Sequence, residues 1–436
     1  MIVSIQPSVL SGTIYAPASK SVMQRVCAAA LIRKGRTVIH NPGYSNDDKS
    51  SLNIIRQLGA NIKEEDHRVE IESKGIVPSS SKLNFEESGL AVRMFTPIAA
   101  LSNKEIVIAG EGSLLDRPMN FFEEVFPLLN VAVKSNNGKL PLHIKGPLQP
   151  GNITVDGSIS SQFLTGLLFA YSAANAKNVS IKVNDLVSKP YIDLTLQIMN
   201  DFGLKTPLNE NYSDFYFDDS SKVDQLLTNS YTIEGDWSGA SFFLVAAAIK
   251  GNVTIRGLLR ESFQADKKIS EVLSMVGADV VEDVDSIKVS HHSLHPFEFD
   301  ATDCPDLFPP LVALAANCKG LSKIHGLQRL KFKESDRGIA LQQEFAKLNT
   351  KIELNADTML IHGNETIIVK DPQLNSHNDH RIAMACAIAG LNANIPIEIK
   401  GADAVKKSYP EFWDHLKSLN ADLSLKPFTT DNTFRL

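Results

Sequence analysis

The stretch APASKSVMQR, residues 16–25, places two cationic side chains in the first turns of a helical pattern. Lys20 follows Ser19 directly, and Arg25 comes about one turn later. The N-terminal end of a helix carries partial positive charge, so each cation there is unfavourable by roughly 0.3–1 kcal/mol. An anion would neutralise these cations, and the free N–H groups of a helix N-terminus themselves attract anions. The stretch, which also contains Ser21, therefore predicts an anion-binding site.

A second charged cluster, RLKFKESDR, opens the helical pattern SDRGIALQQEFAKL. Its charged residues are Arg329, Lys331, Lys333, Glu334, Asp336 and Arg337. One interpretation is a solvated, charged helix start with Ser335 as the N-cap. The other is a further part of an anion-binding site. The cluster taken alone leaves both interpretations open.

A repeat of roughly 72 residues runs through the chain. In each copy an apolar helix end is followed by Gly or Asn and then by the alternating start of a strand. Gly and Asn tolerate the left-handed position that ends a helix. The six positions, 71, 73, 74, 72 and 71 residues apart, are Gly59, Asn130, Gly203, Gly277, Asn349 and Asn420. Six such units account for nearly all of the 436 residues.

Each repeat also contains a helix rich in small apolar residues, such as VCAAALI in the first copy and SFFLVAAAI in the fourth. The alternation of strands and helices indicates an α/β fold whose unit reads strand, helix, strand, helix, strand pair. Helices that are apolar nearly all round are buried on most sides, so we expect them inside and the sheets outside. One core rarely exceeds about 250–300 residues, which predicts two domains of three repeats each.

The domain boundary is expected between the third and fourth repeats, near residues 228–234. The first strand is expected to belong to the far domain, which gives a second crossing of the chain. The predicted domains are residues 1–16 with 233–436, and residues 17–232, with hinges near 13–19 and 228–236.

Polar loops precede the six small-residue helices at equivalent positions of the repeat. If the helices of one domain are roughly parallel, their positive ends meet on one face, and two such faces predict an anion-binding cleft. These loops and the segments near them carry Lys20, Ser21, Arg25, Gly89, Arg93, Arg117, Ser160, Ser161, Gln162, Ser188, Lys189, Tyr191, Asp303, Asp306, Asp379, His380, Arg381, Lys406 and Lys407. A local carboxylate partner would explain any single arginine, but the set in phase with the repeat favours shared anion binding.

Composition limits the class of protein. The apolar fraction of 43% and the charged fraction of 22% are those of an ordinary globular protein. A net charge of −6 argues against nucleic-acid binding and a general membrane-surface role. No signal-peptide pattern and no membrane-spanning apolar run is evident. The four widely spaced cysteines indicate reduced, mostly buried thiols. We therefore expect a cytoplasmic enzyme.

Several sites known from other enzymes are absent from the sequence. No dinucleotide-binding GxGxxG, phosphate-binding GxxxxGK[ST] or nucleophile-elbow GxSxG pattern occurs. HHSLH, residues 291–295, could suggest a metal, but a surface histidine cluster is the simpler interpretation. Asp47 and Asp48 are expected to cap the helix that follows them.

The motifs PASKSVMQR, SSQFLTGLL, SKPYID, EGDWSGASFFLVAAAI, KESDR and NDHRIAM occur here in one order. In combination they resemble the enolpyruvylshikimate-phosphate synthase family, from residue 17 to residue 413. The resemblance implies two domains of three βαβαββ-type units, called an inside-out α/β barrel, that close on a hinge. It implies transfer of the enolpyruvyl group of phosphoenolpyruvate to the 5-hydroxyl of shikimate 3-phosphate. It also implies a monomer with neither cofactor nor metal, and no nucleic-acid or membrane partner.

The resemblance also implies residue roles. Shikimate 3-phosphate is expected to contact Lys20, Ser21, Arg25, Ser160, Ser161, Gln162, Ser188, Tyr191, Asp306 and Lys333. Phosphoenolpyruvate is expected to contact Lys20, Gly89, Arg117, Gln162, Arg337, Arg381 and Lys407. Asp306 matches the base at the 5-hydroxyl, Glu334 matches the acid that protonates the methylene carbon, and Lys20 is the third catalytic residue. His380 and Arg329 match positions close to the site, and Arg93 matches a structural arginine.

The chain departs from the family pattern around Gly89. Glu87 and Leu90 stand where the family usually has asparagine and threonine, and a carboxylate near phosphoenolpyruvate would repel it unless it turned away or paired. These departures bear on sensitivity to the inhibitor glyphosate. Two alternative functions stay open: the sister enzyme that acts on UDP-N-acetylglucosamine, and a non-catalytic repeat scaffold that binds an anionic partner.

Overall fold

The computed structural model describes residues 1–219 and 229–427. The chain divides into two compact units, each described by itself below. Unit 1 comprises Met1–Pro17, Trp237–Arg260 and Asp266–Leu436, and unit 2 comprises Ala18–Asp236 and Glu261–Ala265. The segment Glu261–Ala265, which the sequence pattern does not separate from residues 233–436, belongs to unit 2. Residue 228, where the expected hinge began, lies outside the described residues.

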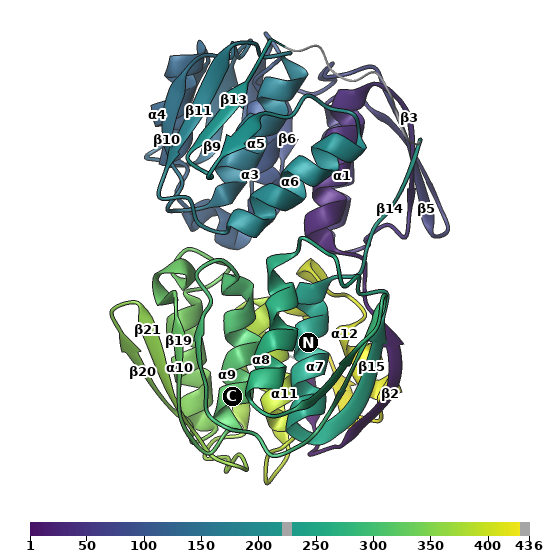
Figure 1. Cartoon of the computed structure of the whole chain (residues 1–436), viewed down its shortest axis with the longest axis vertical. Helices are drawn as coiled ribbons and strands as arrows, with labels where there is room; N and C mark the ends of the chain where they lie inside the picture. The colour runs from purple at the N-terminus through teal and green to yellow at the C-terminus, as the bar shows by residue number, and fades with distance from the viewer. Residues whose placement is uncertain (220–228, 428–436) are drawn as a thin grey trace, which may run out of the picture. The chain divides into compact units, whose positions relative to one another are not determined.

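The described strands form six four-stranded sheets, three in each unit (Figure 1). In a complete repeat the first strand pairs parallel with the second, the second pairs antiparallel with the fourth, and the fourth pairs antiparallel with the third. In unit 2 the first complete repeat consists of β6 (Lys82–Asn84), α3 (Gly89–Ala99), β7 (Glu105–Ala109), a 3-10 turn (Gly112–Asp116), α4 (Asn120–Val125), a 3-10 turn (Phe126–Leu129), β8 (Ala132–Asn136) and β9 (Lys139–Lys145). The second consists of β10 (Ile153–Asp156), α5 (Ser161–Ala173), β11 (Val179–Asn184), α6 (Lys189–Asp201), β12 (Leu208–Glu210) and β13 (Asp214–Phe217).

Unit 1 contains one complete repeat and one that the chain's first strand completes. The complete repeat consists of β18 (Glu298–Asp300), a 3-10 turn (Pro305–Leu307), α9 (Phe308–Ala316), β19 (Gly320–His325), a 3-10 turn (Leu327–Leu330), α10 (Arg337–Lys347), β20 (Lys351–Asn355) and β21 (Thr358–Gly363). The other consists of β22 (Gln373–Asn375), α11 (His380–Gly390), β23 (Ile397–Lys400), a 3-10 turn (Ala402–Lys407), α12 (Phe412–Ser418), β24 (Leu423–Lys426) and β1 (Ile2–Ile5). There β1 lies between β23 and β24, antiparallel to both.

The remaining two repeats exchange their first strands. β2 (Leu10–Tyr15) completes a sheet of unit 1 but leads into the helix of unit 2; β14 (Ser230–Thr232) completes a sheet of unit 2 but leads into the helix of unit 1. The repeat after β2 contains α1 (Lys20–Arg33), β3 (Gly35–His40), α2 (Asn46–Gln57), β4 (Asn61–Glu65) and β5 (Arg68–Ser73). The repeat after β14 contains α7 (Trp237–Lys250), β15 (Gly251–Arg256), a 3-10 turn (Ala265–Lys268), α8 (Ile269–Met275), β16 (Asp279–Glu282) and β17 (Ser286–Ser290). The strands β1 and β2 therefore both lie in unit 1.

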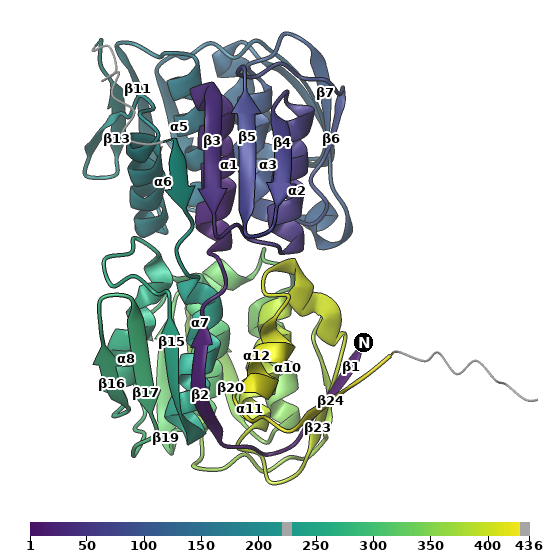
Figure 2. The same ribbon diagram turned by 90° about the vertical axis from the view of Figure 1, so that its right-hand side faces the viewer.

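The small-residue helices are buried inside each unit, as predicted. Every residue of α3, α9 and α11 is buried, and all of α7 except Lys250. In Figure 2 the strands β3, β5 and β4 lie in front of α1 and α3, so this sheet covers the helices of unit 2. Alanine and glycine let such helices approach one another closely, because their short side chains keep the backbones near each other.

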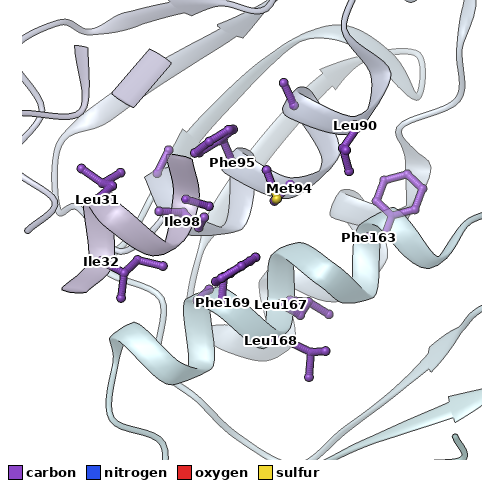
Figure 3. Packing of buried hydrophobic residues seen from close by; sticks show 14 of the residues in the cluster. Leu31, Ile32, Leu90, Met94, Phe95, Ile98, Phe163, Leu167, Leu168 and Phe169 are labelled. Atoms are coloured by element: carbon purple, nitrogen blue, oxygen red, sulfur yellow. The ribbon is translucent and has the colours of Figure 1, made fainter. Parts of the chain in front are cut away.

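The pair α3 and α5 shows why a small residue is needed. A Cβ atom added to Gly166 of α5 would lie 2.6 Å from the carbonyl oxygen of Arg93 and 2.8 Å from that of Met94. Figure 3 shows Met94 and Phe95 of α3 in the same apolar interior as Leu167 and Phe169 of α5. Hydrogen at this position is therefore what allows the two helices to pack.

All six predicted helix ends adopt the left-handed conformation. Their φ angles are 114°, 60°, 60°, 98°, 59° and 72° at Gly59, Asn130, Gly203, Gly277, Asn349 and Asn420. This confirms the repeat and its phase. The four cysteines are free and buried, which agrees with the expectation of reduced thiols. In the described part of the chain, no helix has the length and apolar character needed to cross a membrane.

The first prediction concerns the packing of α3 and α5. Gly166→Ala should lower the free energy of unfolding by about 1–3 kcal/mol, because the added methyl group overlaps the backbone of α3. Gly151→Ala is a matched control, since nothing lies within 4 Å of its added Cβ. Denaturant unfolding should show a change within about 0.5 kcal/mol for the control. Equal stability of the two variants would contradict this account of the helix pair.

Candidate active site

The predicted site residues fall into two groups, one in each unit. In unit 2 they lie at the N-terminal ends of α1, α3, α5 and α6, and in the turn before α4. In unit 1 they lie at the starts of α10 and α11 and in three 3-10 turns or the loops next to them. The expected cleft between the domains stays a prediction.

Hydrogen bonds join the helix starts of unit 2. Gln24 of α1 donates to Ser88, which precedes α3, over 3.3 Å. Arg93 of α3 donates through Nη1 to Oε1 of Gln162 in α5 over 2.9 Å. Arg25 of α1 donates through Nε to the hydroxyl of Thr195 in α6, also over 2.9 Å. The four helix ends therefore lie together, so their unpaired N–H groups and positive ends can act on one anion.

Arg25 is a buried cation whose partners are neutral. Its side chain is 1% exposed and also donates to the backbone oxygens of Ser21 and Tyr191. Its guanidinium carbon lies 5.7 Å from the centre of the Tyr191 ring. Burial lowers the pKa of Arg25 to about 10, while Tyr191 acts in the opposite direction. Among residues 1–219 and 229–427, no carboxylate forms an ion pair with Arg25. A buried charge without a counter-charge is costly, so this position favours an anionic ligand.

Three serines occupy helix starts of unit 2. Ser160 is the N-cap of α5, and its hydroxyl accepts a hydrogen bond from the backbone N–H of Gln162. Ser161 is buried at the first position of α5. Ser188 precedes α6 and has a φ of 55°, in the left-handed region. Such a backbone costs a residue other than glycine about 1–3 kcal/mol and is frequent at functional sites.

Lys20 forms an ion pair that the sequence did not indicate. Its Nζ lies 2.9 Å from Oδ2 of Asp47, and each side chain is 14% exposed. The prediction that both Asp47 and Asp48 cap α2 is therefore half wrong. Ser45 and Asp48 form a reciprocal capping box, whereas Asp47 pairs with Lys20.

The segment around Gly89 brings Arg117 and Glu87 together with one turn. A Cβ atom added to Gly89 would lie 2.3 Å from Nη1 of Arg117, so the guanidinium occupies the space that glycine leaves. Glu87 accepts hydrogen bonds from the backbone N–H and hydroxyl of Ser113, both over 3.1 Å. Arg117 in turn lies 3.5 Å from the Ser113 hydroxyl. The carboxylate of Glu87 is therefore hydrogen-bonded to Ser113. This is the pairing that would keep its charge from repelling an anion near Gly89.

In unit 1, Asp306 lies among three cations. Its Oδ1 is 2.7 Å from Nη1 of Arg337 and 3.2 Å from Nζ of Lys333, and its Oδ2 is 3.3 Å from Nη2 of Arg381. Burial raises the pKa of Asp306, but Arg381, Lys333 and Arg337 together outweigh it, so the pKa lies well below its usual range. Burial lowers the pKa of Lys333 to about 8, although Asp306 opposes this shift.

Arg337 joins this group to two further carboxylates. Its Nη2 lies 2.5 Å from Oε2 of Glu334, and its Nε lies 2.9 Å from Oδ2 of Asp379. Burial alone would lower the pKa of Arg337, but Asp379, Glu334 and Asp306 raise it above its usual range. Asp336 rather than Ser335 is the N-cap of α10. The simple helix-start interpretation of this cluster was thus wrong about the cap, because the Ser335 hydroxyl donates to Asp379 instead.

The other predicted residues lie near the same helix starts. Lys407 donates through Nζ to the backbone oxygen of Asn378, next to Asp379, over 2.8 Å. His380 is 1% exposed at the first position of α11, with Nδ1 at 3.9 Å from Oδ1 of Asp379. Arg329 lies in the 3-10 turn before Lys333, and burial lowers its pKa while Asp306 opposes the shift.

Three acidic or polar residues of the site were missed. Asp379 was noted in its loop but given no role; it is fully buried and also accepts from the backbone N–H of Arg381. Ser238, at the start of α7, accepts from Nη2 of Arg381 over 3.0 Å and donates to Asp266. The signal for Ser238 was its place in the fourth polar loop, for which no candidate had been named. Asp266 has no comparable signal.

Metal ligands are not clustered in the described part of the chain. No group there contains three or more His, Cys, Asp or Glu side chains placed to hold a metal ion. His291, His292 and His295 are exposed in the connection after β17, in agreement with a surface histidine cluster.

Two solved structures of enolpyruvyl transferases superimpose on this chain. EPSP synthase from Acinetobacter baumannii superimposes with a TM-score of 0.80 at 24% identity, covering 97% of this chain and 100% of that one. The enolpyruvyl transferase NikO from Streptomyces tendae gives 0.74 at 15% identity, covering 97% and 98%. The chain therefore has the enolpyruvyl transferase fold, and the predicted two-domain inside-out α/β barrel of six repeats is confirmed.

Proteins with similar sequences identify the family within the enolpyruvyl transferases. The 3-phosphoshikimate 1-carboxyvinyltransferase of Clostridium kluyveri is 34% identical over 422 residues, 97% of this chain and 98% of the relative. The protein of the same description from Clostridium perfringens is 36% identical over 424 residues, 97% and 99%. A family model described as EPSP synthase (3-phosphoshikimate 1-carboxyvinyltransferase) matches residues 5–416. The chain belongs to the EPSP synthase family.

The second prediction concerns the buried pair of Asp379 and Arg337. Asp379→Asn should lower the free energy of unfolding by about 3–5 kcal/mol, because it leaves part of a buried guanidinium charge uncompensated. Asp336→Asn is the matched control: its side chain caps α10, and asparagine caps a helix equally well. Denaturant unfolding of both variants measures the difference. Similar stabilities would show that Asp379 does not carry the charge of Arg337.

Proposed function

We propose that this chain transfers the enolpyruvyl group of phosphoenolpyruvate to the 5-hydroxyl of shikimate 3-phosphate and releases phosphate. This is the 3-phosphoshikimate 1-carboxyvinyltransferase step of the shikimate pathway, which leads to chorismate and the aromatic amino acids. Membership of the EPSP synthase family supports the reaction. The observation in the structure that carries it is the placement of Asp306 and Glu334 around one buried arginine. A site that only bound anions would gain nothing from two carboxylates.

We assign the sugar phosphate to the helix starts of unit 2 together with Asp306 and Lys333. The buried, unpaired charge of Arg25 and the left-handed Ser188 support this assignment. The full set is Lys20, Ser21, Arg25, Ser160, Ser161, Gln162, Ser188, Tyr191, Asp306 and Lys333. Serine hydroxyls and helix N–H groups are suitable donors for a phosphate dianion.

We assign phosphoenolpyruvate to a second set of mostly cationic residues. The set is Lys20, Gly89, Arg117, Gln162, Arg337, Arg381 and Lys407. Arg117 lies directly over Gly89, and Arg337 and Arg381 share Asp306. Planar guanidinium groups suit the carboxylate and phosphate of this substrate, because they donate two parallel hydrogen bonds.

The proposed reaction begins with two proton movements. Glu334 delivers a proton to the methylene carbon of phosphoenolpyruvate, and the electron pair of the double bond forms the new C–H bond. The neighbouring carbon becomes cation-like and is attacked by the 5-hydroxyl, whose proton passes to Asp306. Both carboxylates thus act as general acid and base, and the surrounding cations, including Lys20, stabilise the charge that develops.

The second half reverses the first proton transfer. The tetrahedral adduct loses a proton from its methyl group to Glu334, the C–H electron pair forms the double bond again, and the bond to phosphate breaks. The departing phosphate takes up the proton that Asp306 received from the 5-hydroxyl, so both carboxylates return to their starting states. Asp306 has a low pKa while Arg337 and Arg381 neutralise it. When a substrate carboxylate shares those arginines, their effect on Asp306 weakens and its basicity rises. The scheme uses neither cofactor nor metal.

The decisive test is phosphate release from phosphoenolpyruvate with shikimate 3-phosphate as the acceptor. Release that requires this acceptor supports the proposal. Release only with UDP-N-acetylglucosamine would assign the sister activity, and no release with either would favour the non-catalytic scaffold. We further propose that the chain acts in the cytoplasm as a monomer, and that the two units are its two functional domains.

The third prediction concerns pH. Lys333 is protonated below about pH 8 and loses its charge above it, so binding of the sugar phosphate should weaken as pH rises through 8. The value of kcat/KM for shikimate 3-phosphate, which reports the free enzyme, should fall by up to about tenfold per pH unit there. In Lys333→Arg this alkaline limb should move to higher pH. A limb that stays in place would assign the titration to another group.

The fourth prediction tests the acid. Glu334→Gln should lower kcat by about 100- to 10,000-fold, because the amide cannot exchange the proton that the methylene carbon needs. Substrate binding should largely persist, and calorimetry with shikimate 3-phosphate measures it. Glu298→Gln is the control, because Glu298 is exposed on a strand and its variant should keep full turnover. Glu344 is buried and therefore does not serve as a control. Turnover near the wild-type value in Glu334→Gln would remove this role.

A further inference from the structure

The amide of Gln162 has one defined orientation. Its Oε1 accepts the hydrogen bond from Nη1 of Arg93 over 2.9 Å. A guanidinium group has only donors, so the amide atom that faces it must be the oxygen. The amide nitrogen therefore points away from Arg93. The oxygen and nitrogen of an amide have similar shapes, so shape alone does not distinguish them. Here the neighbouring guanidinium identifies the oxygen.

The orientation matters because both proposed substrates are anions. Gln162 is the one residue besides Lys20 that we assign to both, and it is partly exposed in the first turn of α5. An anion accepts hydrogen bonds and repels an oxygen, so only the NH₂ end of the amide is useful to it. A rotated amide would present its oxygen to the ligand and its NH₂ to a cation.

Arg93 is well placed to prevent that rotation. Its side chain is 5% exposed, and its guanidinium carbon lies 5.1 Å from the centre of the Phe163 ring, next to Gln162 in the chain. The close approach of α3 and α5 at Gly166 holds the backbones of the two residues in register. Arg93 Nη1 is also 3.6 Å from the Cβ position of Gly89. Its guanidinium therefore lies beside two residues assigned to phosphoenolpyruvate.

We propose that Arg93 is a positioning residue that fixes the Gln162 amide with its NH₂ end toward the anionic substrates. The proposal rests on the proposed function and deepens it. It differs from the purely structural role that the resemblance implied for Arg93. A structural arginine would support the fold, whereas a positioning arginine acts on turnover through Gln162.

A double-mutant cycle separates these roles. Arg93→Met should lower kcat/KM for phosphoenolpyruvate by about 10- to 100-fold, the range expected for one hydrogen bond to a charged group. In the Gln162→Ala background the same change should have less than about a twofold effect, because there is no amide left to orient. Arg36→Met is the matched control: Arg36 is exposed on β3, and its loss should leave kcat/KM unchanged.

Two further variants keep the test decisive if Arg93→Met folds poorly in thermal unfolding. Arg93→Lys retains a donor and should restore part of the activity. Gln162→Glu can still accept from Arg93 but presents a second carboxylate oxygen to the ligand, so it should lose more affinity than Gln162→Ala. The opposite ranking of the two Gln162 variants would overturn the proposal.

The cycle is measured on turnover and, by calorimetry, on the dissociation constant of shikimate 3-phosphate. If the fold-losses of the two single variants multiply in the double variant, in both turnover and binding, the positioning role of Arg93 is overturned. Turnover by the wild-type chain would in that case still support the proposed function. Absence of wild-type turnover would overturn the proposed function, and the coupling in sugar-phosphate binding would still decide the role of Arg93.

Discussion

A buried guanidinium needs a counter-charge, and the two units meet this requirement in opposite ways. In unit 1, Arg337 is 1% exposed and contacts three carboxylates, which belong to the turn before α9, the loop before α10 and the cap of α11. The three segments must therefore be in place together for this charge to be stable. In unit 2, Arg25 is equally buried but has only neutral partners. Unit 1 thus provides the carboxylates that neutralise its buried arginine, whereas unit 2 provides only hydroxyl and backbone oxygens for Arg25.

The repeat explains why these buried charges lie near helix starts. In each unit three helices of small residues pack in the interior, and the sheets surround them. The charged side chains Arg25, Arg93 and Arg381 then lie within the first two turns of their buried helices. Gly166 is needed for this close packing of the helices, because any side chain there would push α3 away from α5. Arg93 of α3 would then lie farther from Gln162 of α5.

Much of the fold could be predicted because its signals are local. Gly59 and Asn130 end helices for reasons that lie within their own turns, and repetition at a fixed spacing multiplies that signal. The partners of charged side chains were less accessible. Asp47 and Asp48 are adjacent and chemically identical, yet one caps α2 and the other pairs with Lys20. Nothing in the sequence distinguishes them, because the choice depends on where α1 lies.

The site shows the same limit. Helix starts rich in Lys, Arg and Ser indicated where anions should bind, but the sequence could not say that Asp379 would face Arg337 or that Glu87 would turn to Ser113. Both contacts join loops from different repeats or turns. Contacts of this kind are fixed by packing, which a one-dimensional pattern does not contain.

The exchange of first strands has a consequence for how the chain is made. Unit 2 needs nothing beyond β14 and the short segment Glu261–Ala265, so it can be assembled once the chain has left the ribosome as far as Ala265. Strand β1 (Ile2–Ile5) pairs with β23 (Ile397–Lys400) and β24 (Leu423–Lys426), which are synthesised much later. At roughly 5–20 residues per second, it waits on the order of 20 to 80 seconds for its partners. During synthesis β1 is thus a strand without its sheet partners while unit 2 can already be complete, and the sheet of β22, β23, β1 and β24 closes after it.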